Sequence, residues 1–330
     1  MSKQELDVIG IGNAIVDVLT HTDDGFLKEH DLDKGGMMLI DARRAEYLYS
    51  KMGQCTEMSG GSAGNTMAGI ASLGGSGAYV GKVGNDQLGD VFAHDMRSVG
   101  IEFDTEPLFD SAPTARCLVL ITPDAQRTLN TFLGACVELS PRDIKPEQIA
   151  RGKVTYLEGY LWDPPKAQEA FVKAARIAHK NQRKVSLSLS DKFCVDRHRE
   201  SFIDLVDHHV DILFANETEI GALFETDSFD DAVRKVRGKC EIAALTRSEK
   251  GAVIVHKDGT EEVSAERVGK VVDTTGAGDL YAAGFLHGYT RGRPLAECAR
   301  IGAIAAAEVI SHDGARPETS LEKLVQQKLG

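Results

Sequence analysis

Residues 271–285 read VVDTTGAGDLYAAGF, and this stretch decides how the rest of the chain is interpreted. A glycine-rich turn that opens a helix can bind an anion, because its backbone N–H groups are unpaired and the helix dipole adds positive potential. Gly276 and Gly278 would let the backbone approach a ligand closely, since neither carries a Cβ. The carboxylate of Asp279 fits two interpretations: an ordinary helix N-cap, or a base beside a bound phosphoryl group.

The neighbours of this turn favour the second interpretation. Asp273, Thr274 and Thr275 add polar groups to the same loop, and small residues follow Asp279, so the helix can be buried tightly. Phosphoryl transfer needs positioning, charge neutralisation and a base, which such a loop could supply. The chain contains no G-x-x-x-x-G-K-[ST] sequence, so a P-loop kinase is excluded.

The composition is that of an ordinary globular protein and excludes several classes of partner. The chain has 330 residues, enough for one large domain, and a formal net charge of −12, which argues against nucleic-acid and membrane partners. The six cysteines lie far apart without a C-x-x-C pair, and the N-terminus lacks the apolar core of a signal peptide. We expect reduced thiols in a cytoplasmic protein, and no metal site made of protein ligands alone.

The pattern of apolar residues predicts an α/β fold. Residues 6–12 read as a buried strand, and the next segment, 15–20, is again extended. That order, together with Ile15 at the sixth position of G-x-G-x-x-G, rules out a dehydrogenase fingerprint. From about residue 154, strands and helices alternate, which indicates a doubly wound, mostly parallel sheet. The β-rich stretches at about 15–58 and 110–137 break this rhythm, so we expect a single domain with a small inserted sheet that acts as a lid.

Several local elements can also be predicted. Asp41 reads as the N-cap of a helix, a helix begins near Asp279, and another begins near Pro294. Hairpins are expected at 115–134 and 251–263, and an extended segment, RVGKVV (267–272), is expected just before the glycine-rich turn.

Four motifs together resemble the PfkB/ribokinase family of carbohydrate and nucleoside kinases. They are GGSAGNT (60–66), GKVGNDQLGD (81–90), NETE (216–219), and DTTGAGD followed by AAGF. The resemblance covers nearly the whole chain. Within the family it is closest to the bacterial adenosine-kinase type, on GNAIVD (12–17), RTLNTFLGA (127–135), SLSDKF (188–193) and DILFANETE (211–219).

The resemblance implies a role for each matching residue. Asp279 would take the proton from the primary hydroxyl of the acceptor, and the backbone amides of Gly276, Ala277, Gly278 and Asp279 would form an anion hole. A polar clamp would hold the sugar hydroxyls, and its members would be Asn13, Asp17, Gly61, Ser62 and Asn65. A carboxylate suits two adjacent hydroxyls. Without the resemblance, Asp17 is only the solvent-facing position of an alternating strand.

The resemblance also implies a pocket for a nucleoside base. Its members would be Phe193 as a stacking ring, the apolar residues Leu39, Leu120 and Leu129, and Thr131 nearby. Alternatively, Phe193 is a surface aromatic that covers the core. Met37 and Met38 depart from the polar residue of some relatives, so their effect on base selectivity stays open.

ATP would bind on the other side of the anion hole. The residues implied are Arg127, Asn216, Thr246, Ser248, Gly251 and Thr275, with Glu219 organising Mg²⁺ mainly through water. Arg127 could equally be an exposed turn arginine, and Ser248 stands where the family often has glycine. A monovalent cation such as K⁺ could support the anion hole.

The resulting expectation is ATP-dependent phosphorylation of the 5′-hydroxyl of adenosine, giving AMP and ADP. The alternatives are a kinase for a free sugar such as ribose or fructose, a kinase for another purine nucleoside such as inosine, and a non-catalytic nucleoside-binding protein on the same fold. The sequence leaves open whether the chain is a monomer or a homodimer.

Overall fold

The computed structural model describes residues 4–124 and 126–330, which form one nine-stranded sheet and one five-stranded sheet. The order of the large sheet is β14-β13-β12-β11-β10-β9-β1-β5-β6. Its strands are β1 (Leu6–Ile11), β5 (Gly77–Val80), β6 (Ile101–Phe103), β9 (Gly152–Glu158), β10 (Lys184–Ser188), β11 (Ile212–Asn216), β12 (Ile242–Thr246), β13 (Ala252–His256) and β14 (Gly259–Val263). Pairing is parallel from β6 to β12 and antiparallel at β13 and β14.

Helices cover both faces of the large sheet, which explains why its strands are continuous apolar runs. One apolar core lies against α5 (Pro146–Ile149), α6 (Pro165–Lys180), α7 (Lys192–His209), α8 (Glu217–Phe224) and α9 (Phe229–Val236). The opposite core lies against α3 (Ser62–Ser72), α4 (Gln87–Ser98), α10 (Ala277–Thr290) and α11 (Leu295–Val309), with α12 (Leu321–Leu329) beside them. The predicted doubly wound, mostly parallel sheet is confirmed.

The small residues after the glycine-rich turn allow close helix packing. A Cβ placed on Gly284 would lie 2.7 Å from the Cα atom of Gly302, so α10 and α11 touch through their backbones. A Cβ on Gly69 of α3 would lie 2.7 Å from the Cβ of Ala283. The helix that carries Asp279 is therefore held firmly between two neighbours.

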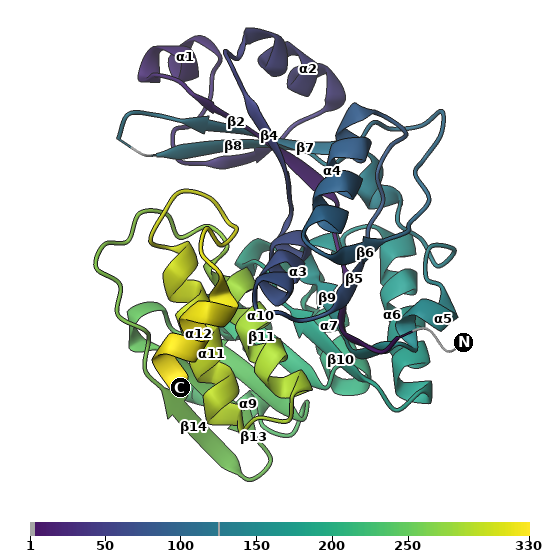
Figure 1. Ribbon diagram of the computed structural model, residues 1–330, viewed down its shortest axis with the longest axis vertical. Helices are drawn as coiled ribbons and strands as arrows, with labels where there is room; N and C mark the ends of the chain where they lie inside the picture. The colour runs from purple at the N-terminus through teal and green to yellow at the C-terminus, as the bar shows by residue number, and fades with distance from the viewer. Residues whose placement is uncertain (1–3, 125) are drawn as a thin grey trace.

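The second, smaller sheet has the order β3-β8-β7-β2-β4, and we call it the small sheet. Its strands are β2 (Ile15–His21), β3 (Met37–Leu39), β4 (Thr56–Gly60), β7 (Ala115–Ile121) and β8 (Arg127–Phe132). All five fall in, or within two residues of, the two stretches predicted to leave the α/β rhythm. Figure 1 shows this sheet above the large domain, with α1 (Asp24–Glu29) and α2 (Ala42–Lys51) on its far side.

The two faces of the small sheet differ in what they contact. Val18 and Leu118 belong to the face that packs into a core with Leu27 of α1 and Leu48 of α2. The opposite face carries Asp17 together with a small apolar cluster, whose members are Ile15, Leu19, Cys117, Val119, Ile121 and Leu129. Among the described residues, no helix contributes to the apolar cluster on this second face.

Most local predictions are confirmed. Asp41 caps α2 by accepting a hydrogen bond of 2.7 Å from the N–H of Arg44, α11 follows Pro294, and both predicted hairpins form. The turn of the first hairpin includes residue 125, which lies outside the described residues. The extended segment predicted at 267–272 is wrong, because this stretch is a loop. It runs past the end of α11, where the N–H of Val272 donates to the carbonyl of Ile310 at 2.8 Å, and no strand lies alongside it.

No helix within the described ranges is long and apolar enough to cross a bilayer.

Candidate active site

The carboxylate of Asp279 is oriented by two side chains from α3. Ser62 Oγ donates to one oxygen at 2.6 Å, and Asn65 Nδ2 donates to the other at 3.0 Å. Burial raises the pKa of Asp279 to about 6, and these two hydrogen bonds partly oppose the rise. Gly276, rather than Asp279, is the N-cap of α10, so the N-cap interpretation of Asp279 is wrong. The geometry suits a base that titrates just below neutral pH.

The turn before Asp279 leaves room for a ligand. A Cβ on Gly278 would meet no atom within 4 Å, whereas Gly276 has φ +79° and its Cβ would lie 2.8 Å from the carbonyl oxygen of Ala315. Gly276 is thus required by the local backbone, and Gly278 is open. Among the described residues, the N–H groups of Gly278 and Asp279 have no backbone acceptor. Free amides at a helix N-terminus can receive an anion.

The start of α3 brings the predicted sugar clamp together. Gly61 has φ +80°, and a Cβ there would lie 2.3 Å from the carbonyl oxygen of Asn13. A Cβ on Gly60 would lie 2.3 Å from an Asp17 carboxylate oxygen. The loop of Asn13 and the side chain of Asp17 therefore lie directly against the glycines that precede Ser62.

Unpaired acceptor atoms surround this turn. The side-chain oxygens of Asn13 and Asn65 are buried, and neither has a hydrogen-bond partner among the residues that the structure describes. Burial raises the pKa of Asp17 to about 6, and Asp279 adds to the rise, while Arg316 and Arg127 oppose it. Because buried polar groups are normally paired, these atoms are suited to a ligand that donates hydrogen bonds.

Sequence reasoning missed Glu158, a buried carboxylate at the end of β9. One oxygen accepts from the N–H and Nδ2 of Asn13 at 3.1 and 2.6 Å, and the other accepts from the N–H of Ala63 at 2.7 Å. Burial raises its pKa to about 7, although these hydrogen bonds oppose the rise. Glu158 thus joins the Asn13 loop to the start of α3. Its YLEG sequence (156–159) looks like any strand end, so no pattern marked it.

The second feature missed is the segment Asp313–Arg316, which we call the C-terminal strap. The N–H of Gly314 donates to Asp273 at 3.1 Å, and Ala315 lies against Gly276. The strap therefore supports the glycine-rich turn from outside. It belongs to no motif and no periodic element, so no sequence pattern marked it.

Arg127 joins the small sheet to the large domain. Its guanidinium lies 3.0 Å from Asp273 and 3.2 Å from Asp313, and its side chain is only 10% exposed. The alternative of an exposed turn arginine is therefore wrong. Asp273 also accepts from the N–H and the hydroxyl of Thr275 at 3.0 and 2.7 Å, which holds the predicted phosphate residue Thr275 against its own loop.

The predicted base pocket is only partly assembled. Leu39 and Leu129 lie on the face of the small sheet that carries Asp17, and Leu39 is 56% exposed. The hydroxyl of Thr131 on the same face donates to Cys117 Sγ at 3.3 Å. Phe193, in the first turn of α7, is 70% exposed, so it does not cover the core.

Leu120 is a correction to the predicted pocket. Strand alternation places it on the opposite face of the small sheet, fully buried in the core under α1 and α2. It cannot contact a base beside Asp17.

The two methionines before Leu39 lie on different faces of the small sheet. Met37 lies on the face of Leu39 and is 59% exposed, whereas Met38 lies on the other face.

The predicted nucleotide residues gather at neighbouring strand ends. Asn216 at the end of β11 pairs with Thr246 at the end of β12, and an ion pair of 2.9 Å between Arg247 and Glu217 joins the loops that follow. Ser248 and Gly251 then turn the chain with φ of +51° and +90°. This placement agrees with the rule that ligands of α/β sheets bind beyond the carboxyl ends of the strands.

Glu219 is largely occupied by a capping box. Its two oxygens accept from the N–H and Nδ2 of Asn216 at 2.9 and 2.6 Å. Burial raises its pKa to about 7, and the carboxylates of Asp191 and Asp279 add to the rise. Over the described ranges, no group of three or more His, Cys, Asp or Glu side chains could hold a metal ion directly. The arrangement fits a cation that is held mainly by phosphates and water.

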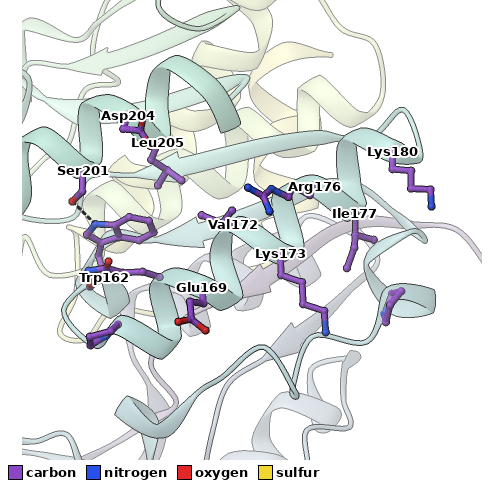
Figure 2. Close-up of a pocket in the computed structure, with 13 residues that line it drawn as sticks. Trp162, Glu169, Val172, Lys173, Arg176, Ile177, Lys180, Ser201, Asp204 and Leu205 are labelled. Carbon is purple, nitrogen blue, oxygen red and sulfur yellow. Dashed lines mark hydrogen bonds between the residues drawn. The ribbon is translucent and has the colours of Figure 1, made fainter.

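A groove of about 780 Å³ lies elsewhere, between α6 and α7. Figure 2 shows Trp162 at one end, where its indole N–H donates to Ser201 at 2.8 Å, and Lys180 at the other. None of the candidate site residues lines this groove.

Comparisons with known proteins agree with the site. The sequence profile of the pfkB family carbohydrate kinases matches residues 30–322. The crystal structure of an adenosine kinase from Sinorhizobium meliloti is 53% identical, covers 98% of this chain and 99% of its own, and superposes with a TM-score of 0.91. That of a probable sugar kinase from Rhizobium etli CFN 42 is 52% identical, with the same coverage and TM-score.

A more distant relative shares the same extent. An adenosine kinase of Dictyostelium discoideum is 24% identical over 340 residues, covering 97% of this chain and 98% of the relative. The family match favours an enzyme over a non-catalytic nucleoside-binding protein. The chain belongs to the pfkB family of carbohydrate kinases and is a phosphotransferase that acts on a hydroxyl group.

Proposed function

We propose that the protein is an adenosine kinase, which transfers the γ-phosphoryl group of ATP to the 5′-hydroxyl of adenosine to give AMP and ADP. The observation that carries this choice is the exposed apolar face of the small sheet beside Asp17. Met37 and Leu39 are 59% and 56% exposed on it, next to the Leu129 cluster. Burying such a surface against a purine is favourable, whereas a bare sugar gains little from it.

The polar groups below this face would bind the ribose. Asp17 and the free side-chain oxygens of Asn13 and Asn65 would accept from its hydroxyls. Glu158 would act as a positioning residue, because it fixes Asn13 relative to α3. Phe193 would supply a ring for the base.

The chemical step would be an in-line displacement. Asp279 accepts the proton of the 5′-hydroxyl, the oxygen attacks the γ-phosphorus, and the bond to the β-phosphate oxygen breaks to release ADP. The amides of Gly276, Gly278 and Asp279 would receive the charge on the phosphoryl oxygens, whereas the N–H of Ala277 donates to the carbonyl of Thr274 at 3.3 Å. Ser62 and Asn65 keep the Asp279 carboxylate facing the acceptor.

ATP would bind beside the strand ends of Asn216 and Thr246, with Ser248, Gly251 and Thr275 near it. Mg²⁺ bound with ATP would neutralise phosphate charge, and Glu219 would hold it through water. A requirement for a monovalent cation such as K⁺ stays a prediction, which assays in potassium and tetramethylammonium salts would test.

We also propose that the small sheet acts as a lid over the acceptor. Arg127 is the contact that supports this role, because it joins the lid to Asp273 of the glycine-rich loop. If the Arg127 guanidinium released Asp273, it could bind a phosphate group of ATP in its place. Closure would exclude water from the transferred phosphoryl group.

The test is a panel of acceptors with Mg-ATP: adenosine, inosine, ribose and fructose. The proposal expects kcat/KM to be highest for adenosine. A higher value for ribose or fructose would overturn the adenosine assignment and leave the phosphotransferase intact.

A free-sugar kinase is the second candidate, and a specific observation supports it. The probable sugar kinase of Rhizobium etli is 52% identical to this chain and the adenosine kinase of Sinorhizobium meliloti 53%, with the same TM-score of 0.91. The polar clamp around Asp17 would serve either acceptor, so the apolar face is the feature that favours adenosine.

A further inference from the structure

The C-terminal strap contacts three separate parts of the candidate site: the small sheet, the glycine-rich turn and the start of α3. Asp313 pairs with Arg127 of the small sheet, Gly314 binds Asp273, and Ala315 lies against Gly276. The last residue of the strap, Arg316, continues to the first turn of α3. Asp17 lies against Gly60 just before this turn, and Asp279 is hydrogen-bonded to Ser62 and Asn65 within it.

The guanidinium of Arg316 is enclosed, and the described residues give it no ion-pair partner. A Cβ on Gly64 would lie 3.6 Å from its Nη2, which is 3.8 Å from Met96 Sδ. Its Nε is buried and has no hydrogen-bond partner within the described part of the chain. No carboxylate among residues 4–124 and 126–330 lies within ion-pair distance. A buried charge without compensation is costly, so this position calls for a functional reason.

Two carboxylates act on Arg316 from a longer distance, Asp17 first and Asp95 second. Asp95 is already occupied, because it accepts from the N–H and hydroxyl of Ser59 at 2.8 and 3.1 Å. Asp17 accepts no hydrogen bond from the described residues. Of the two carboxylates, Asp17 is therefore the one without a hydrogen-bond donor among the described residues.

Opposing influences act on Asp17 from the elements around it. Arg316 from the strap and Arg127 from β8 favour its charged form, whereas burial and Asp279 of α10 disfavour it. The thiol of Cys117 faces it from β7. Arg127 is engaged by Asp273 and Asp313, which leaves Arg316 as the cation without another partner.

We propose that Arg316 is a positioning residue of the acceptor site, which supplies the positive charge opposite the Asp17 carboxylate while that carboxylate accepts hydrogen bonds from the acceptor's hydroxyl groups. The acceptor class is a sugar or nucleoside with two adjacent hydroxyls. The identity of the acceptor rests on the proposed function, whereas the positioning role of Arg316 does not depend on it.

The experiment compares the wild type with Arg316→Met and Arg316→Lys on adenosine and on 2′- and 3′-deoxyadenosine, over pH 6 to 9. Arg316→Met should raise KM for adenosine about 10- to 100-fold with little change in kcat, the size of a hydrogen bond to a charged group. Arg316→Lys should restore most of the affinity. The discrimination between adenosine and at least one deoxy analogue should collapse in Arg316→Met.

Two readouts separate this role from a structural one. KM of Arg316→Met should recover as pH rises, because Asp17 then ionises without help, and the effects of Asp17→Asn and Arg316→Met should not add. An equal loss for all acceptors at every pH, or an unchanged KM, would overturn the proposal. Arg234→Met, at an exposed position on α9, is the matched control and should behave as the wild type.

Failure of the proposed function gives a different result. If the wild type phosphorylates ribose rather than adenosine, the same variants are tested on ribose and 2-deoxyribose, with the same expected pattern. If Arg316→Met does not fold, Arg316→Lys, which keeps the positive charge, is compared with Arg316→Gln, which loses it. An equal KM for these two variants would overturn the proposal.

Discussion

At the scale of single residues, two hydrogen bonds from α3 orient the Asp279 carboxylate, which is the proposed base. Asp279→Asn keeps the size of the side chain but cannot accept a proton. We expect kcat to fall by about 10²- to 10⁴-fold with a modest change in KM, measured by steady-state kinetics with Mg-ATP. Asp90→Asn, on the exposed side of α4, is the control. Near-normal turnover of Asp279→Asn would remove this residue from the mechanism.

The same hydrogen bonds predict a pH shift. Asp279 must be ionised to act, so kcat should decline as pH falls through about 6. Ser62→Ala removes a bond that holds its pKa down, so the decline should begin at a higher pH than in the wild type. A pH profile of kcat for the two proteins measures this. A decline that moves to lower pH would contradict the assigned role of Ser62.

Residues inside motifs could be predicted, and residues outside them could not. The sequence placed Asp279, Ser62 and Asn65 around one site because their motifs are long. Glu158 and Arg316 gave no signal, because their importance comes from burial and from which neighbours the fold supplies.

At the scale of elements, the small sheet separates two sets of side chains by strand alternation. Leu39→Ser places a hydroxyl on the face beside Asp17, and we expect KM for adenosine to rise roughly 5- to 20-fold because apolar contact with the base is lost. Activity on ribose, if detectable, should not change. Met38→Ser alters the opposite face of the same strand and is the matched control. Equal effects of the two substitutions would argue against a base pocket on this face.

Periodicity identified the elements well where it was regular. The buried strands from β9 to β12 and the hairpin of β13 and β14 follow directly from apolar runs and turns. Leu120 was placed in the base pocket by the resemblance alone, and the pairing of β7 with β2, which is distant in sequence, puts it on the face opposite Asp17. The loop at 267–272 has the composition of a strand but no neighbour to pair with.

At the scale of the whole molecule, buried acids make stability depend on pH. The pKa of Glu158 is about 7 in the folded protein against an ordinary 4.5, so the folded state keeps a proton that the unfolded chain releases. Its contribution to stability is complete below the ordinary value and is lost as pH rises through about 7. Glu158→Gln removes this pH-dependent loss of stability, because glutamine does not ionise and places no charge in the core.

We therefore expect the difference in Tm between Glu158→Gln and the wild type to shift in favour of the variant by at least roughly 2 °C between pH 5 and pH 8. Differential scanning calorimetry at both values measures it. Comparing the two proteins cancels other titrating groups, such as His287, whose pKa is lowered to about 4 by burial. A difference that is the same at both pH values would show that Glu158 is ionised throughout.

The overall architecture followed from the sequence, but the assembly of the site did not. Alternating strands and helices imply a parallel sheet, yet nothing in the periodicity says that the strap at 313–316 reaches the first turn of α3. That contact depends on the path of the chain after α11, which irregular residues determine.

The position of the strap near the end of the described chain also affects how the enzyme folds during translation. Residues of the site run from Asn13 to Arg316, so the sheet and both of its helical layers can form on a nascent chain before Asp313 has left the exit tunnel. At that stage Arg127 and Asp273 lack one partner, and Asp17 lacks its opposite charge. Acceptor binding should therefore arise in one late step of translation, and stalled chains that have released residues up to the end of α11, but not the strap, should be folded and should bind the acceptor weakly.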